Sequence, residues 1–200
     1  MREDDLRLER ILDAVPPFIP PCIPTLRSAP PNGDHWQHEI RFDGWRIQLH
    51  KHDTNLTLYT RNGNDCGWTF PALQIAAHFA SLRDLRGVKS AVIDGELVAC
   101  NGDGLPDFYA LHFRRHGHAL CVWAFDLLYL NRRDLRALPL HERKRQLERV
   151  VKRSRVDWLQ LSETFADGAR LLAEAERIGL EGVAPSASMR RTNRAGVASG

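Results

Sequence analysis

The sequence predicts an α+β fold, in which strands and helices are interleaved. Short segments of alternating or clustered apolar residues end at turn signals such as Asp-Gly and Asn-Gly, which is typical of strands. Segments with helical apolar spacing are interleaved with them, without a strict βαβ rhythm. With 200 residues, of which 43% are hydrophobic, the chain is long enough to bury a substantial core.

The amino-terminal elements are an amphipathic helix, predicted over 2–14, and an extended arm. Most of the eleven prolines lie between Pro16 and Pro31, and such a segment excludes regular helix and central strand. Because the segment also carries apolar residues, we expect it to lie over the domain. Strands are then expected over 36–42, 45–52 and 55–61, and a helix over 71–83.

The second half of the chain continues the mixture of strands and helices. Residues 90–100 are interpreted either as two strands about Asp94-Gly95 or as one bent strand. The apolar run over 118–130 is expected to be a strand that is buried on both faces. The remaining elements are expected to be helices over 106–115, 139–153 and 167–179 and strands over 158–163 and 180–184.

Composition excludes several classes of protein. No apolar run approaches the roughly 20 residues that a membrane-spanning helix needs, and the charged amino terminus has no secretory signal pattern. The four cysteines form no CxxC pair, which argues against a disulfide scaffold or zinc ribbon and favours the cytoplasm. We expect the histidines of His50-x-His52 and of 112–118 to lie on the surface rather than to bind a metal.

Four segments place polar residues where a sheet interior should be apolar. Each alone is consistent with a turn or a solvated strand face, but their order and spacing resemble the adenylation (nucleotidyltransferase) domain of ATP-dependent DNA ligases, closest to the bacterial non-homologous end-joining group. The segments are Glu39-Ile-Arg41-Phe-Asp43-Gly44-Trp45-Arg46, Asp94-Gly95-Glu96, Phe125-Asp126-Leu-Leu and Glu181-Gly182-Val183, with further matches at 30–36, 60–63 and 134–143.

The resemblance implies a fold with an ATP cleft between antiparallel sheets, and ATP and Mg²⁺ as cofactors. In this family a lysine amine attacks the α-phosphorus of ATP, and the AMP then passes to a DNA 5′-phosphate. Carboxylates hold the divalent metal and ribose, arginines bind phosphate, and an aromatic ring stacks on adenine. By position, the resemblance places Glu39 near adenine, Arg46 and Arg61 near ribose and phosphates, Glu96 and Glu181 at ribose and metal, and Phe125 against adenine.

The nucleophile departs from the family pattern, because the lysine of Lys-x-Asp-Gly is replaced by Arg41. A guanidinium has a pKa above about 12 and offers no lone pair at usable pH, so we expect no phosphoramidate at this position. The chain has only four lysines, and none of them stands at the motif position. Ser186 occupies roughly the place of a later family lysine, and the family's Lys-x-Lys strand is absent.

These observations predict a ligase-like adenylation domain of DNA repair and recombination that is truncated and unable to self-adenylate. A non-catalytic module that binds nucleotide or DNA ends is the alternative, whereas an RNA ligase or capping-type relative is less consistent with the lead-in. The resemblance implies nicked or broken double-stranded DNA as the partner, with a separate OB-fold chain or end-joining protein. We expect no membrane association, and association with the nucleoid if DNA is bound. We expect an arm over 1–34, the adenylation domain over 35–183 without an OB-fold, and a disordered tail over 184–200.

Overall fold

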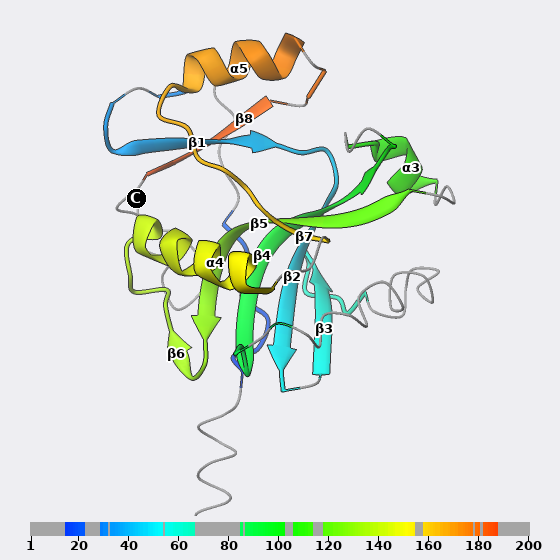
Figure 1. Cartoon of the computed structure of the whole chain (residues 1–200), viewed down its shortest axis with the longest axis vertical. Helices are drawn as coiled ribbons and strands as arrows, with labels where there is room; N and C mark the ends of the chain where they lie inside the picture. Colours follow the sequence, from blue (N-terminus) through cyan, green and yellow to red (C-terminus); the bar gives the residue numbers. More distant parts are fainter. Residues whose placement is uncertain are drawn as a thin grey trace, which may run out of the picture.

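The strands form two sheets with helices packed against them, as Figure 1 shows for the whole chain. Among the described residues, no helix is long and apolar enough to cross a membrane. The computed structural model describes residues 15–22, 29–31, 33–53, 55–66, 85, 87–102, 106–113, 118–154, 158–177, 179–180 and 182–187.

The larger sheet has the strand order β3-β2-β4-β5-β6, and β7 pairs with β5 in parallel. All other pairings in this sheet are antiparallel, so the prediction of a mainly antiparallel α+β fold is confirmed. The predicted strands agree with the observed ones to within a few residues, whereas β6 was not predicted. The strands are β2 (Trp45–His52), β3 (Asn55–Thr60), β4 (Ser90–Cys100), β5 (Ala119–Leu130), β6 (Arg133–Asp134) and β7 (Leu159–Leu161).

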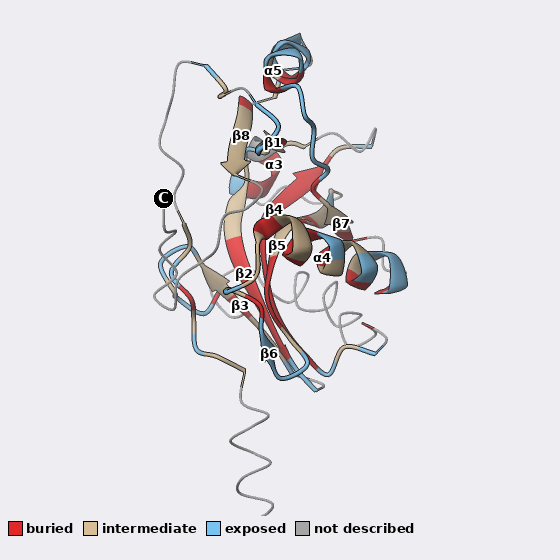
Figure 2. Cartoon of the chain, turned by 90° about the vertical axis from the view of Figure 1, so that its left-hand side faces the viewer, coloured by how far each residue is buried: buried red, intermediate tan, exposed pale blue. Residues whose placement is uncertain are grey.

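Helix α4 (Leu140–Ser154) covers one face of this sheet and packs mainly on β5. Its buried residues Leu147 and Val150 join the main core, as their helical spacing predicts. Figure 2 shows that burial is concentrated in the central strands and on the side of α4 that faces them. The helix therefore has an inner and an outer face with different surroundings.

Strand β4 is one continuous strand, and the irregularity lies in its partner β5. The register passes from Asp94↔Asp126 to Gly95↔Ala124, so Phe125 has no opposing residue. Such a bulge bends the strand and re-aims its side chains. The expected burial of β5 on both faces holds for 127–129 but is wrong for Trp123 and Phe125, which are only partly buried.

The smaller sheet consists of β1 (Trp36–Arg41) and β8 (Gly182–Ala187), paired antiparallel. Helix α5 (Gly168–Arg177) packs on both strands and lies above them in Figure 1. A Cβ atom at Gly168 would overlap the His38 ring, so glycine permits this close approach. The pairing of the first strand with the last holds the motif at 39–46 next to the segment that follows Glu181.

Residues 15–22 lie against the face of the larger sheet that α4 does not cover. The Ile19 backbone nitrogen donates to Gln48 Oε1 at 2.9 Å, and Gln48 Nε2 donates to the Ile19 carbonyl oxygen at 2.9 Å. Ile19 packs with Val92, whereas the adjacent Ile93 belongs to the core under α4, so the two clusters occupy opposite faces. The described part of the arm thus lies over the domain, as predicted.

Two expected boundaries need correction. Helix α3 spans Phe108–His112 rather than 106–115, because the Asp107 side chain accepts from the Ala110 backbone nitrogen and so caps the helix start. The strand expected over 180–184 runs to Ala187, so the expected tail does not begin at residue 184: residues 184–187 pair with β1. The expected helices over 2–14 and 71–83, and residues 188–200, lie outside the described residues.

Candidate functional site

Arg41, which stands at the nucleophile position, is the last residue of β1 and is exposed. It pairs with Gly182, the residue directly after Glu181, so the two motif segments lie side by side. The turn that follows reaches across to the larger sheet, where the Phe42 ring stacks on Trp123 with centroids 4.6 Å apart. A Cβ atom at Gly44 would overlap the Leu97 carbonyl oxygen, so only glycine allows the turn to approach β4 this closely.

Arg46, Glu96 and Phe125 are brought together from three strands. Arg46 pairs with Glu96 in the β2–β4 register, and its guanidinium carbon lies 4.8 Å from the centroid of the Phe125 ring. The guanidinium is held by Asp94, with Nη2 at 2.8 Å from Oδ2 and Nε at 3.2 Å from Oδ1, and Nη1 donates to the Cys22 carbonyl oxygen. An aromatic ring, a carboxylate and a fixed guanidinium are groups that bind a base, a ribose and a phosphate.

Glu39 is buried and faces α4 instead of standing open in a cleft. Its Oε2 lies 2.7 Å from Lys144 Nζ, and both side chains are at most one-tenth exposed. Burial raises the pKa of the Glu39 carboxyl, although Lys144 and a hydrogen bond with Ser162 act in the opposite direction. Because residues two apart on a strand share a face, Lys144 lies on the same side of β1 as Arg41.

A second ion pair joins Arg143 and Asp126, and the charge of Asp126 acts on both Glu39 and Asp94. Arg143 Nε donates to Asp126 Oδ1 and Nη2 to Oδ2, both at 2.8 Å, in the bidentate geometry that makes such pairs strong. Asp126 pairs in register with Asp94, and its charge adds to the burial that raises the pKa of the Asp94 carboxyl, against the charge of Arg46. The site is therefore framed by three ion pairs in which each carboxylate has its own cation.

The remaining predicted residues are distributed as follows. Arg61 is exposed in the turn after β3, and because Thr60 pairs with Ile47, it leaves the sheet at the end where Arg46 stands. Ser186 lies within β8 opposite Gln37. Glu181 lies outside the described residues.

The lysines can now be compared with the position of Arg41. Lys51 and Lys89 lie at the far end of β2 and β4, and five residues along a strand separate Lys51 from Arg46 by about 17 Å. Lys152 is exposed on α4 and pairs with Glu148. Lys144 is the lysine beside β1, and its Nζ is engaged by Glu39.

The carboxylate chemistry of Glu96 fits a magnesium ligand, since Mg²⁺ takes oxygen donors. Its predicted companion, Glu181, is not described, and the described residues contain no group of three side chains that could hold a metal ion. His50 is buried, contrary to the expectation of a surface position, and its Nε2 lies 2.8 Å from Gln48 Oε1.

Four residues of these ion pairs were given no site role from the sequence: Asp94, Asp126, Arg143 and Lys144. Asp94 and Asp126 stood within recognised motifs, and an acid inside an apolar strand is itself a signal that a buried cation is needed. Arg143 ends the motif match over 134–143 but was given no role there. Lys144 gave no signal, because the surrounding sequence is rich in basic residues and is equally consistent with a solvated helix face.

Comparison with known proteins places this geometry in a family. The sequence pattern of the ATP dependent DNA ligase domain matches residues 25–185. The multifunctional non-homologous end joining protein LigD of Pseudomonas aeruginosa is 37% identical over 173 residues, which are 84% of this chain and 20% of that protein. The bifunctional LigD of Bacillus subtilis is 31% identical over 140 residues, 64% of this chain and 23% of that protein. The chain thus spans about a fifth of the length of these relatives.

Solved structures agree with the sequence comparison. The chain superposes on mycobacterial DNA ligase D complexed with ATP and MES with a TM-score of 0.71 at 27% identity, covering 90% of this chain and 59% of that one. The ligase domain of LigD from M. tuberculosis gives a TM-score of 0.72 at 26% identity, covering 86% of this chain and 56% of that one. The chain therefore belongs to the ATP-dependent DNA ligase family and has the nucleotidyltransferase fold of its adenylation domain.

Proposed function

We propose that this domain binds ATP between its two sheets but does not form the covalent adenylate of an active ligase. The observation that carries the proposal is the position of Arg41, at the end of β1 beside the segment that follows Glu181, with no lysine at that position. A guanidinium keeps its proton and has no free electron pair with which to attack phosphorus. Its charge still suits a phosphate oxygen.

The residues at the other motif positions support retention of the nucleotide. Phe125, with Arg46 against its ring, offers an aromatic surface to adenine, and Glu96 offers a carboxylate to the ribose hydroxyls. Asp94 holds the Arg46 guanidinium in place through two hydrogen bonds, so the group needs little reorganisation on binding. Glu39 is already paired with Lys144, so in this structure its carboxylate is engaged by a cation.

The first experiment asks whether a covalent adenylate forms. The protein is incubated with ATP and magnesium and its intact mass is measured; we expect no added AMP. The Arg41→Lys variant is treated in the same way, and we expect little or no adduct, because Ser186 still replaces a further family lysine. An AMP adduct on the unaltered protein would contradict the proposal and would be mapped to its lysine.

The second experiment tests nucleotide binding by calorimetry. Replacing Phe125→Leu should weaken ATP binding about tenfold, since stacking on one base contributes about 1–3 kcal/mol. Phe113→Leu is the matched control, because Phe113 is 63% exposed on the segment after α3, and it should leave ATP binding unchanged. No detectable binding of millimolar ATP by the unaltered protein would refute this part of the proposal. The relatives named above are end-joining proteins. For this chain we propose end joining only as the process in which the domain is used.

A further inference from the structure

Two cysteines, Cys100 and Cys121, lie on neighbouring strands at the end of β4 and β5 that leads to α3. Cys100 is the last residue of β4 and pairs with Ala119, whereas Cys121 pairs with Val98. The two cysteines are therefore diagonal neighbours on one face of the sheet. A hydrogen bond with the Cys121 thiol, together with burial, raises the pKa of the Cys100 thiol, so the two thiols are in contact.

The two thiols differ in their access to solvent. Cys100 is only 6% exposed, and Pro106 pairs back on it in an isolated bridge. The Asp107 backbone nitrogen donates to the Ala99 carbonyl oxygen at 2.7 Å, which holds the returning chain in place. Cys121 is partly exposed. A small oxidant in solution therefore reaches Cys121 first and finds Cys100 beside it as a second thiol.

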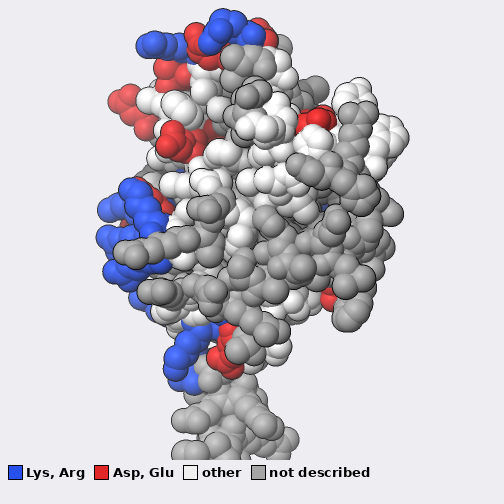
Figure 3. All heavy atoms as spheres, turned by 45° about the vertical axis from the view of Figure 1, so that its right-hand side comes forward, with Lys and Arg blue, Asp and Glu red and all other residues white. Residues whose placement is uncertain are grey.

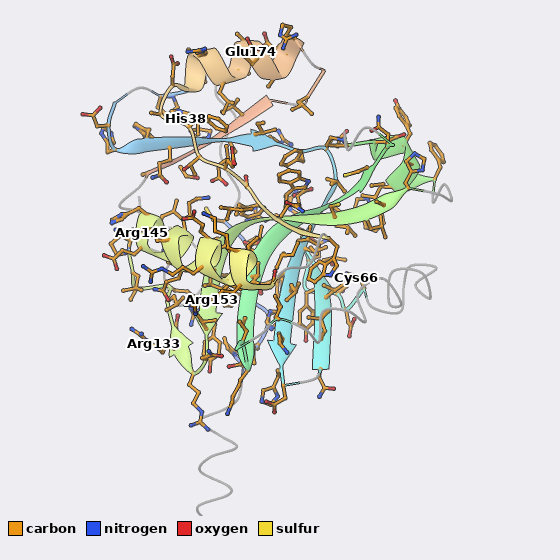
Figure 4. All side chains as sticks on the ribbon, in the orientation of Figure 1. His38, Cys66, Arg133, Arg145, Arg153 and Glu174 are labelled. Carbon is orange, nitrogen blue, oxygen red and sulfur yellow. The ribbon has the colours of Figure 1, made fainter. Side chains whose placement is uncertain are left out.

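The other two cysteines are engaged elsewhere. Cys66 is buried, its Sγ donates to the Leu58 carbonyl oxygen at 3.2 Å, and burial raises the pKa of its thiol to about 11. Figure 4 shows Cys66 beside β3, away from the end of β4 and β5 that leads to α3. Cys22 lies in the arm, where its carbonyl oxygen accepts from Arg46. The contact between Cys100 and Cys121 thus singles out one pair.

We propose that Cys100 and Cys121 are a reversible oxidation site, at which a low-molecular-weight disulfide such as glutathione disulfide converts the two thiols into a cross-strand disulfide. The Cys121 thiolate attacks one sulfur of glutathione disulfide, which forms a mixed disulfide and releases one glutathione thiolate. Cys100 gives up its proton, attacks the Cys121 sulfur and displaces the second glutathione as a thiolate. Two cysteine thiols are oxidised, one glutathione disulfide is reduced, and the two thiol protons pass to the two glutathione molecules.

The diagonal arrangement makes this disulfide reversible rather than structural. Diagonal neighbours on antiparallel strands lie about 7–8 Å apart, whereas the Cα atoms of a disulfide are usually about 4.4–6.8 Å apart. The bond therefore has to draw the two strand ends together, and a strained disulfide is more easily reduced. Because Cys100 is the last residue of β4, the movement falls where the strand ends.

The pair lies on the face of the sheet that carries the candidate site. Cys100 is four residues from Glu96 on β4, Cys121 is two residues from Trp123 on β5, and Glu96 pairs with Trp123. The Trp123 ring stacks on Phe42 of the motif turn, so the bond forms next to this turn. In Figure 3 the described Lys and Arg side chains gather over α4 and α5, whereas the side toward α3 is mostly uncharged. We therefore attribute the reactivity of Cys121 to its partner thiol and not to a surface of cations.

The test maps disulfides in the unaltered chain after incubation with glutathione disulfide, alkylation of the remaining thiols and digestion with trypsin. Cleavage after lysine and arginine leaves Cys100 in the peptide 90–114 and Cys121 in the peptide 116–132, each without a further cysteine. We expect these two peptides to be joined, with the loss of two hydrogen atoms, and to separate again when reduced glutathione is added in excess. Absence of the joined peptides, equal joining of peptides that contain Cys22 or Cys66, or a bond that resists excess reduced glutathione would each overturn the inference.

Two matched variants test the order of the steps. Cys100→Ser should retain one glutathione on Cys121, because no second thiol is present to displace it. Cys121→Ser should leave Cys100 without glutathione, since that thiol is buried. Circular dichroism of both variants should match that of the unaltered chain. Glutathione on Cys100 in the second variant and none on Cys121 in the first would contradict the proposed order. Because no nucleotide takes part in these measurements, their outcome is independent of the proposed binding of ATP.

Discussion

The inner and outer faces of α4 carry the same kind of side chain in opposite circumstances. Arg143 and Lys144 point inward, where Arg143 pairs with the partly buried Asp126 and Lys144 with the buried Glu39. Arg145, the next residue, points outward into solvent. The comparison teaches that a basic helix segment does not have one function: its inward cations neutralise acids of the site, and its outward ones lie in solvent.

The largest expected effect comes from breaking the inner face at Arg143. Replacement Arg143→Leu leaves the Asp126 carboxylate without its cation in a partly buried setting, so we expect a loss of about 3–5 kcal/mol in the free energy of unfolding. Urea unfolding followed by circular dichroism measures it. Replacing both residues by leucine should recover much of the loss, and a loss below about 1 kcal/mol for the single variant would show that the pair is not a buried one.

An intermediate effect is expected for Lys144→Met, and it should depend on pH. The ordinary pKa of a glutamate is near 4.5, and burial raises that of Glu39; without Lys144 the remaining influences of burial and Asp126 raise it further. Well below pH 4.5 the Glu39 carboxyl is protonated in both the folded and the unfolded chain, so it does not change the free energy of unfolding. As pH rises toward the raised value, the unfolded chain ionises first, so stability falls, by about 1–3 kcal/mol in all.

The control for this prediction is the double variant Glu39→Gln with Lys144→Met, which cannot ionise at position 39. Urea unfolding of both variants from about pH 4 to about pH 8 isolates the contribution of Glu39, because all other titrating groups are shared. If the free energies of unfolding of the single and double variants change with pH in parallel, then ionisation of Glu39 does not destabilise the Lys144→Met variant and the prediction is wrong.

The smallest effect belongs to the outer face. In Lys152→Ala, Glu148 loses the hydrogen bond and charge that lower its pKa, so we expect that pKa to rise toward its ordinary value. Nuclear magnetic resonance titration of the Glu148 carboxyl measures the rise. The midpoint of urea unfolding should stay unchanged, since the Glu148–Lys152 pair is exposed. A clear shift in the midpoint would mean that ion pairs on the outer face of α4 also contribute to stability.

Sequence patterns were sufficient for most of the fold. Strands such as β2 and β3 alternate apolar residues between clear turn signals, so their period and their limits were both readable. Strand β8 was shortened in the prediction because its second half, with a proline and small polar residues, has weak strand propensity. It continues because β1 pairs with it along its whole length, and a neighbouring strand supplies hydrogen bonds that propensity does not report.

The candidate site was predictable in part. The order of the motifs predicts that Arg46, Glu96 and Phe125 lie close together. It does not predict the partners of Asp126 and Glu39, because only the packing of α4 brings their cations close to them. The bulge lies where the sequence predicted a bend about Asp94-Gly95, but only the pairing shows that the extra residue is Phe125 of β5.

The sequence by itself determined that residue 41 cannot act as a nucleophile. The lack of a free electron pair on a guanidinium is a property of the side chain and not of its surroundings. Only the tertiary structure decided which lysine lies beside β1 and which arginines of α4 face solvent. Distances between residues far apart in the chain arise from packing, and at each cation of α4 the burial and the nearest carboxylate decide whether it serves the core or the surface.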